Sequence, residues 1–139
     1  MNEKFTIGEQ ADPVQEVRRL LTYNDFRYKE QNGTFSFRFR DRGYEWETLI
    51  LCREKEVLIY GAYPFPVPEG EEVSRFLQKV NEQVLFGAMI LSGKKLLFRT
   101  GADLFDSYSA YEHIGRSLEY NAGVIVNYWE QAAAVSSAS

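Results

Sequence analysis

The side chains best suited to covalent or proton-transfer chemistry are scarce in this chain. It has one cysteine, Cys52, and one histidine, His113. A nucleophilic cysteine needs a nearby base or positive charge to form its thiolate, and no histidine lies near Cys52 in the sequence. One Cys and one His also exclude an intrachain disulfide and a Cys/His zinc site. The sequence therefore predicts no catalytic residue, no cofactor and no metal site.

Two pairs of carboxylates could act as acid and base, but each lies at the start of a predicted helix. Glu71 and Glu72 open one helix, and Asp103 and Asp106 precede another. Acidic side chains are common there because they cap the helix and interact favourably with its dipole. The chain also lacks the glycine-rich motifs that bind phosphates and dinucleotides. We therefore predict that the protein is not an enzyme.

Three arginines could suit a single-stranded nucleic acid. Arg38, Arg40 and Arg42 are interleaved with Phe37 and Phe39, and basic groups beside aromatic rings form such binding platforms. In a strand, however, the phenylalanines point to the opposite face from the arginines. The formal net charge of −4 also disfavours contact with phosphates. We expect no nucleic-acid partner.

Acidic residues on the following strand would neutralise two of these arginines. The strand Tyr44–Cys52 carries acids at a matching spacing, so a hairpin can place Arg40 opposite Glu45 and Arg38 opposite Glu47. This register also aligns the aromatic residues of the two strands, whereas a slip of one residue would set phenylalanines against acids.

The next strand aligns in the same way. Placing Cys52 opposite Val57 puts Ile50 opposite Ile59 and extends the pairing to Trp46 and Tyr63. After Tyr63 the prolines of the segment 64–68 prevent a central strand, because proline has no N–H to donate. This segment is predicted to be a stiff connector.

Hydrophobic periodicity and turn signals predict eight elements. In chain order they are a helix from Pro13 to about Asn24, strands Thr34–Arg40, Tyr44–Cys52 and Val57–Tyr63, a helix over 69–84, strands Leu85–Leu91 and Lys95–Thr100, and a long helix from about Ser109 to Trp129. This α-β-β-β-α-β-β-α order predicts an α+β fold with a mainly antiparallel sheet. We expect one domain over residues 1–131 and a flexible Ala/Ser tail over 132–139.

Both faces of the predicted sheet are apolar. Large aromatic residues dominate one face, and the other carries Leu49, Leu51, Leu58 and Tyr60. Helices could cover both faces, or a partner could cover the second. Because three helices must also cover the second hairpin, we predict that these four residues bind a protein partner, either a second copy in a homodimer or another polypeptide.

The segment from Glu69 to Thr100 resembles the central signature of the YbjN-like family of bacterial proteins. The matching features are Asn81 at the helix end, Phe86 and Gly87 in the strand that follows, and Arg99 at the end of the hairpin. The resemblance implies that these residues are structural and that the fold is similar to that of type III secretion chaperones. The family carries the label of a sensory transduction regulator, which implies no settled biochemical activity.

The main hypothesis is therefore a non-enzymatic regulatory or chaperone-like module that binds another polypeptide. One alternative is a small-molecule-binding protein or enzyme that uses the aromatic sheet face around Trp46 and Tyr63; another is a dedicated type III secretion chaperone. A pocket with converging polar groups favours the first alternative, and a broad apolar surface favours the main hypothesis.

The sequence also bears on location. Residues 1–10 have neither the basic nor the apolar part of a secretory signal. No stretch approaches the roughly 18 apolar residues of a membrane-spanning helix. We therefore expect a cytoplasmic protein without a membrane partner.

Overall fold

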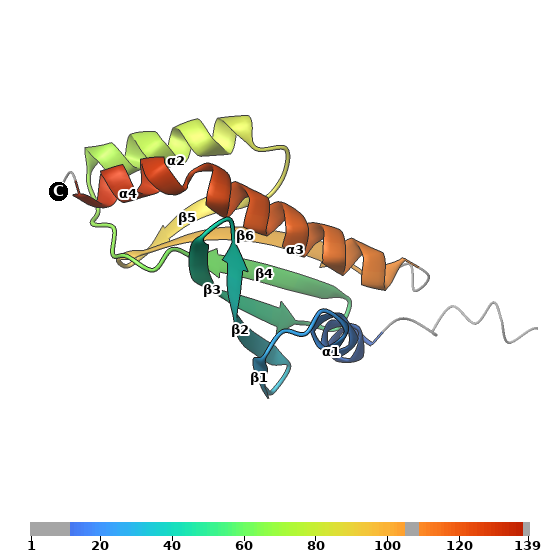
Figure 1. Cartoon of the computed structure of the whole chain (residues 1–139). Helices are drawn as coiled ribbons and strands as arrows, with labels where there is room; N and C mark the ends of the chain where they lie inside the picture. The colour runs from blue at the N-terminus through green and yellow to red at the C-terminus, as the bar shows by residue number, and fades with distance from the viewer. Residues whose placement is uncertain (1–11, 105–108, 138–139) are drawn as a thin grey trace, which may run out of the picture.

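The structure, a computed structural model, describes residues 12–104 and 109–137. The elements in chain order are α1 (Pro13–Tyr23), β1 (Tyr28–Gln31), β2 (Thr34–Asp41), β3 (Tyr44–Cys52), β4 (Glu56–Ala62), α2 (Glu71–Gln83), β5 (Ala88–Ser92), β6 (Lys95–Asp103), α3 (Ala110–Asn127) and α4 (Trp129–Ser137). The strands form one antiparallel sheet in the order β1-β2-β3-β4-β6-β5. The predicted α+β class and antiparallel sheet are confirmed, but the predicted order of elements is wrong at two points (Figure 1).

The first difference is strand β1, which is not among the eight predicted elements. Asn32 and Gly33 adopt positive φ angles of 51° and 76° and form a tight turn between β1 and β2. Asn-Gly is a strong signal for a two-residue hairpin because both residues tolerate positive φ. That signal indicates a strand on each side of the turn, and it was available in the sequence.

The second difference is at the C-terminus, where one long helix and a flexible tail are predicted. The structure instead breaks the helix at Tyr128 and continues as α4 to Ser137. Ala132 is fully buried in the core, and the ring of Trp129 packs on Tyr44 with centroids 4.5 Å apart. Burial of these side chains holds the segment in place, so the predicted tail is wrong over residues 132–137.

The predicted strand registers are confirmed. Arg38 lies opposite Glu47 and Arg40 opposite Glu45 between β2 and β3. Cys52 lies opposite Val57 between β3 and β4. The β3–β4 pairing stops at Glu47 and Ala62, however, one residue short of the predicted pair of Trp46 and Tyr63.

The described helices all pack against one face of the sheet. Helix α1 and the first half of α3 cover one part of this face, and α2, α4 and the second half of α3 cover the rest. Figure 1 shows α2 and α4 side by side and α3 lying over β6 and β4. The covered face contributes large side chains to the core: Phe35, Trp46, Ile50, Ile59, Met89 and Phe98.

Helix α3 lies against β4 and β6 through a buried polar contact. The Asn121 amide donates hydrogen bonds to the carbonyl oxygens of Ile59 (3.1 Å) and Phe98 (2.9 Å). A Cβ atom at Gly61 would lie 2.5 Å from Asn121 Oδ1 and 3.0 Å from Ile125 Cγ1. The close approach of helix and sheet therefore requires glycine at position 61.

We predict that Gly61→Ala lowers the free energy of unfolding by about 1–3 kcal/mol, because the added methyl group pushes α3 away from the sheet. Urea denaturation measures the change. Gly123→Ala is the matched control, since no atom lies within 4 Å of a Cβ there and the change raises helix propensity. Equal stability of Gly61→Ala and wild type would contradict the packing described.

Candidate functional site

The face of the sheet opposite the helices carries a continuous stripe of apolar side chains. We call this surface the helix-free face. The side chains that form the apolar stripe are Leu49, Leu51, Leu58, Tyr60, Ala62, Ile90 and Leu97. The register makes them neighbours across four strands, because Leu51 lies opposite Leu58 and Leu49 opposite Tyr60. Ala62 and Ile90 each lie opposite Leu97.

The four residues predicted to bind a partner therefore lie together on one surface. Leu49 is 39% exposed, and Leu51, Leu58 and Tyr60 are half-buried. Ile90 and Leu97 are not among the residues predicted for this surface. Their place in the stripe depends on β6 pairing with β4, which joins strands separated by a helix.

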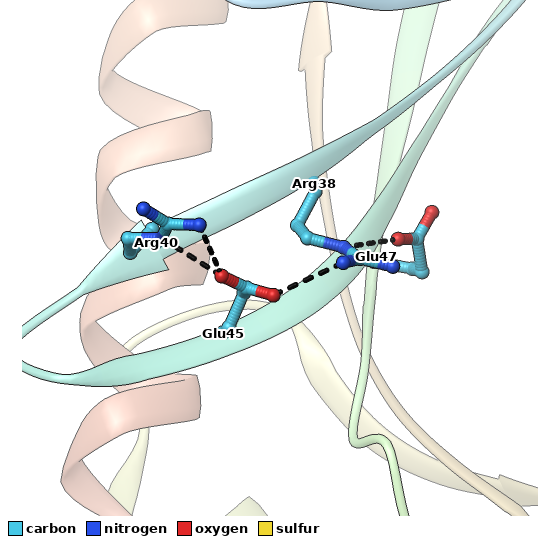
Figure 2. Close-up of polar contacts among 4 residues, drawn as sticks. All are labelled: Arg38, Arg40, Glu45 and Glu47. Atoms are coloured by element: carbon cyan, nitrogen blue, oxygen red, sulfur yellow. Dashed lines mark hydrogen bonds and ion pairs between the residues drawn. The ribbon is translucent and has the colours of Figure 1, made fainter.

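A ladder of ion pairs borders the stripe on β2 and β3 (Figure 2). Glu45 accepts from Arg40 at 2.6 Å and from Arg38 at 3.1 Å, and Arg38 also donates to Glu47 at 3.1 Å. The hydrogen bond from Arg40, with the charges of both arginines, holds the pKa of the Glu45 carboxyl below its ordinary value. Both arginines of the ladder thus have carboxylate partners on their own sheet.

We predict partial recovery of stability in the charge-reversed pair Arg38→Glu with Glu47→Arg, relative to either single variant. Both single changes should cost little because the side chains are exposed. Thermal unfolding of the four proteins gives the coupling between the two positions. Strictly additive losses would argue against the pair.

The two edge strands are protected against pairing with another chain. At the β5 edge the Asn81 amide accepts from the Met89 N–H (2.7 Å) and donates to the Met89 carbonyl (3.0 Å). At the other edge β1 is short and exposes Lys29. Occupied backbone groups and edge lysines both disfavour strand addition.

The other residues that resemble the YbjN-like signature are Phe86, Gly87 and Arg99, and the structure places them in two groups. Phe86 stacks on Tyr120 with centroids 4.1 Å apart, and a Cβ atom at Gly87 would lie 2.6 Å from the Arg99 carbonyl oxygen. With Asn81, these two residues hold the start of β5. The Arg99 side chain is instead exposed on the helix-free face, opposite Tyr60.

Cys52 and His113 do not form a catalytic pair. Cys52 is half-buried against the core, and burial raises the pKa of its thiol to about 11, aided by the charges of Asp12 and Glu30. His113 is exposed in the first turn of α3. A thiol with a raised pKa is a poor nucleophile at neutral pH.

The carboxylate pairs do not form a metal site in the described residues. Glu71 and Glu72 are exposed in the first turn of α2 and face Arg75. Asp106, like residues 1–10, lies outside the described residues. No group of three His, Cys, Asp or Glu side chains that could hold a metal ion occurs within 12–104 and 109–137.

We predict slow alkylation of Cys52 by iodoacetamide in the folded protein. With a pKa of about 11 instead of 9, the thiolate fraction at pH 8 falls roughly 100-fold. The reaction rate should keep rising between pH 9 and pH 11 and increase strongly when the protein is unfolded in urea. Equal rates in the folded and unfolded protein would contradict this environment for the thiol.

None of the known family models, characterised proteins or solved structures compared with the chain matches it. The resemblance to the YbjN-like family therefore stays a hypothesis based on the segment from Glu69 to Thr100. Among the helices of the described residues, none is long and apolar enough to cross a membrane.

Proposed function

We propose that this protein is a non-enzymatic protein-interaction module that binds another polypeptide through the helix-free face. The observation that carries the proposal is the one-sided arrangement of the helices. They cover one face of the sheet, and the opposite face has an apolar stripe bordered by charged side chains. An apolar centre with a polar rim is the usual composition of a protein interface.

The size of the surface is adequate for association. Five strands about 4.8 Å apart, each contributing about seven residues of 3.3 Å, span an area of roughly 550 Å². Stable interfaces bury about 800 Å² of accessible surface on each partner, and a corrugated surface exposes more than its flat area. Burial of one large apolar side chain contributes about 1.5–3 kcal/mol, so the stripe can offset the entropy lost on association.

Charge complementarity favours a second copy of the chain as the partner. A two-fold axis along β4 would place β3 of one copy over β6 of the other. The acidic residues Glu45 and Glu47 on β3 would then approach Lys95 and Arg99 on β6. Neither of these two cations has an ion pair within the described residues.

Strand addition is a less favourable route to the same dimer. The Asn81 amide occupies the β5 edge at Met89. A symmetric pairing of two β1 strands centred on Lys29 or Glu30 would bring like charges opposite each other, which is destabilising. Contact through the helix-free face meets neither obstacle.

The resemblance to the YbjN-like family supports a regulatory or chaperone-like role for this surface in a bacterial, cytoplasmic protein. A dedicated type III secretion chaperone is the alternative role, in which a secreted client would take the place of the second copy. The two roles share the same binding surface, and they differ in the protein that occupies it.

We predict that wild type has twice the chain mass of 16.1 kDa by light scattering. The variant Leu51→Glu with Leu58→Lys should be folded and monomeric, because charges on the stripe prevent its burial. Leu85→Glu is the matched control, since Leu85 is 86% exposed and lies outside the stripe. The control should keep the mass of wild type.

Three results would count against the proposal. An unchanged mass in the double variant would place the interface elsewhere, and a monomeric wild type would exclude the second copy. If the double variant unfolds, Leu49→Glu repeats the test at the most exposed leucine of the stripe. Unfolding of that variant as well would mean that the stripe belongs to the core of the single chain.

A further inference from the structure

We infer that the chain binds a small organic cation with an apolar body in a groove between α1 and α3. The groove has a volume of about 350 Å³ and is lined by the end of α1, the first half of α3, Phe26 and Phe39. Both helices pack on the covered face of the sheet, where they are neighbours (Figure 1). The groove therefore lies on the opposite side of the sheet from the apolar stripe, and it shares no residue with the proposed contact between two copies.

The aromatic walls of the groove are accessible. Phe26, Phe39 and Tyr111 line it and are half-buried, so part of each ring is open to solvent. The Phe26 and Phe39 rings lie with centroids 5.3 Å apart. Leu20 and Leu118, which are 5% and 6% exposed, complete the apolar lining. An apolar group that enters the groove would be buried against these side chains.

The cap of helix α1 fixes Phe26 at the groove. The backbone of Asp25 is in the left-handed region, with a φ of 59°. The Asp25 N–H donates to the Thr22 carbonyl (3.1 Å), and the Phe26 N–H donates to the Leu21 carbonyl (2.9 Å). These two bonds form a Schellman motif, which ends the helix in a defined geometry. The wall is therefore preformed, and a ligand does not have to order it.

Gly115 of α3 keeps the groove open. Glycine in a helix interior is less stable than alanine, so its presence needs a reason. A Cβ atom at Gly115 would lie 3.7 Å from Leu20 Cδ1, an ordinary contact, whereas at Gly61 it would collide with Asn121. Packing within the chain therefore does not require glycine at position 115. A larger side chain there would occupy part of the groove.

The charges at the groove select a cation. Three exposed charged side chains line it, Glu112, Arg116 and Glu119. Arg116 pairs with Glu112 at 3.4 Å, whereas Glu119 has no ion pair within the described residues. Arg19 of α1 lies over one ring of the wall and is paired with Glu16 at 2.8 Å. The charge left without a partner is negative, and the faces of aromatic rings also attract cations.

The volume favours a small molecule as the ligand. About 350 Å³ lies at the lower end of the range of roughly 300–1,000 Å³ found for small-molecule sites. The apolar body would lie against Phe26 and Phe39, and an ammonium group would lie at the rim beside Glu119. A lysine side chain of a peptide carries the same charged group and is the competing occupant.

The test titrates the ¹⁵N-labelled protein with 2-phenylethylamine, a cation at neutral pH, and with 2-phenylethanol, an uncharged analogue of similar shape. We expect the amine to bind at least about fivefold more tightly at low salt, and its affinity to fall as salt screens Glu119. Amide shifts should change most around Phe26 and Gly115. Glu119→Gln should remove the preference for the amine. Glu82→Gln, at an exposed acid of α2 outside the groove, should retain it.

Filling the groove gives a second test. Gly115→Leu should abolish the binding of both probes, because the side chain takes the place of the ligand. Gly123→Leu is the matched control on the same helix, since no atom lies within 4 Å of a Cβ there and the residue is outside the groove. If Gly115→Leu unfolds, Gly115→Ala repeats the test with a methyl group that the structure accommodates, and it should weaken both probes.

The results distinguish this site from the proposed interface. The stripe variant Leu51→Glu with Leu58→Lys should bind the amine as wild type does, because the groove lies on the covered face. Equal affinities for the two probes, no effect of Glu119→Gln, or shift changes confined to the helix-free face would overturn the proposal. Binding of a lysine-containing hexapeptide without binding of 2-phenylethylamine would overturn the small-molecule ligand in favour of the peptide.

Discussion

The close contact between helix α3 and the centre of the sheet determines the rest of the structure. The Asn121 amide bonds to the backbone carbonyls of Ile59 and Phe98 across the surface left open by Gly61. Buried polar groups are costly when unpaired, so a shift of α3 would leave the amide without its acceptors. Helix α1 packs on α3, α4 follows α3 after the break at Tyr128, and α2 packs on α4. Each helix is thereby directed to the same face.

The described helices lie on one side of the sheet and leave its other face uncovered. Its centre is apolar, the ladder of Arg38, Arg40, Glu45 and Glu47 borders it, and both edge strands resist strand addition. This combination favours contact through the face and disfavours contact through the edges. Cys52 has a thiol pKa raised to about 11, so the thiol is protonated at neutral pH. His113 is exposed and lies far from Cys52 in the sequence. The two side chains do not form a nucleophile and base pair.

The same packing leaves little of the aromatic sheet face accessible for the alternative function, a small-molecule-binding protein or enzyme. Helices cover most of that face, so Phe35, Ile50 and Phe98 are inaccessible to a ligand. At its margin, where the proline connector leaves β3, Trp46 and Tyr63 are also buried, with 2% and 3% of their surfaces exposed.

The sequence by itself determined the features that depend on neighbouring residues. Alternation and charge matching predicted the β2–β3 register, and hydrophobic periodicity predicted α1 and α2. The Asn32-Gly33 turn also contained the information for β1, although the strand was not predicted from it. The identities of Leu49, Leu51, Leu58 and Tyr60 as one apolar surface followed from the period of two. Only the tertiary structure decided which face the helices cover and that Leu97 and Ile90 extend the stripe. These features depend on the pairing of β4 with β6 and on the position of α3 against the sheet. Both bring together residues that are far apart in the chain, so neither leaves a periodic signal in the sequence.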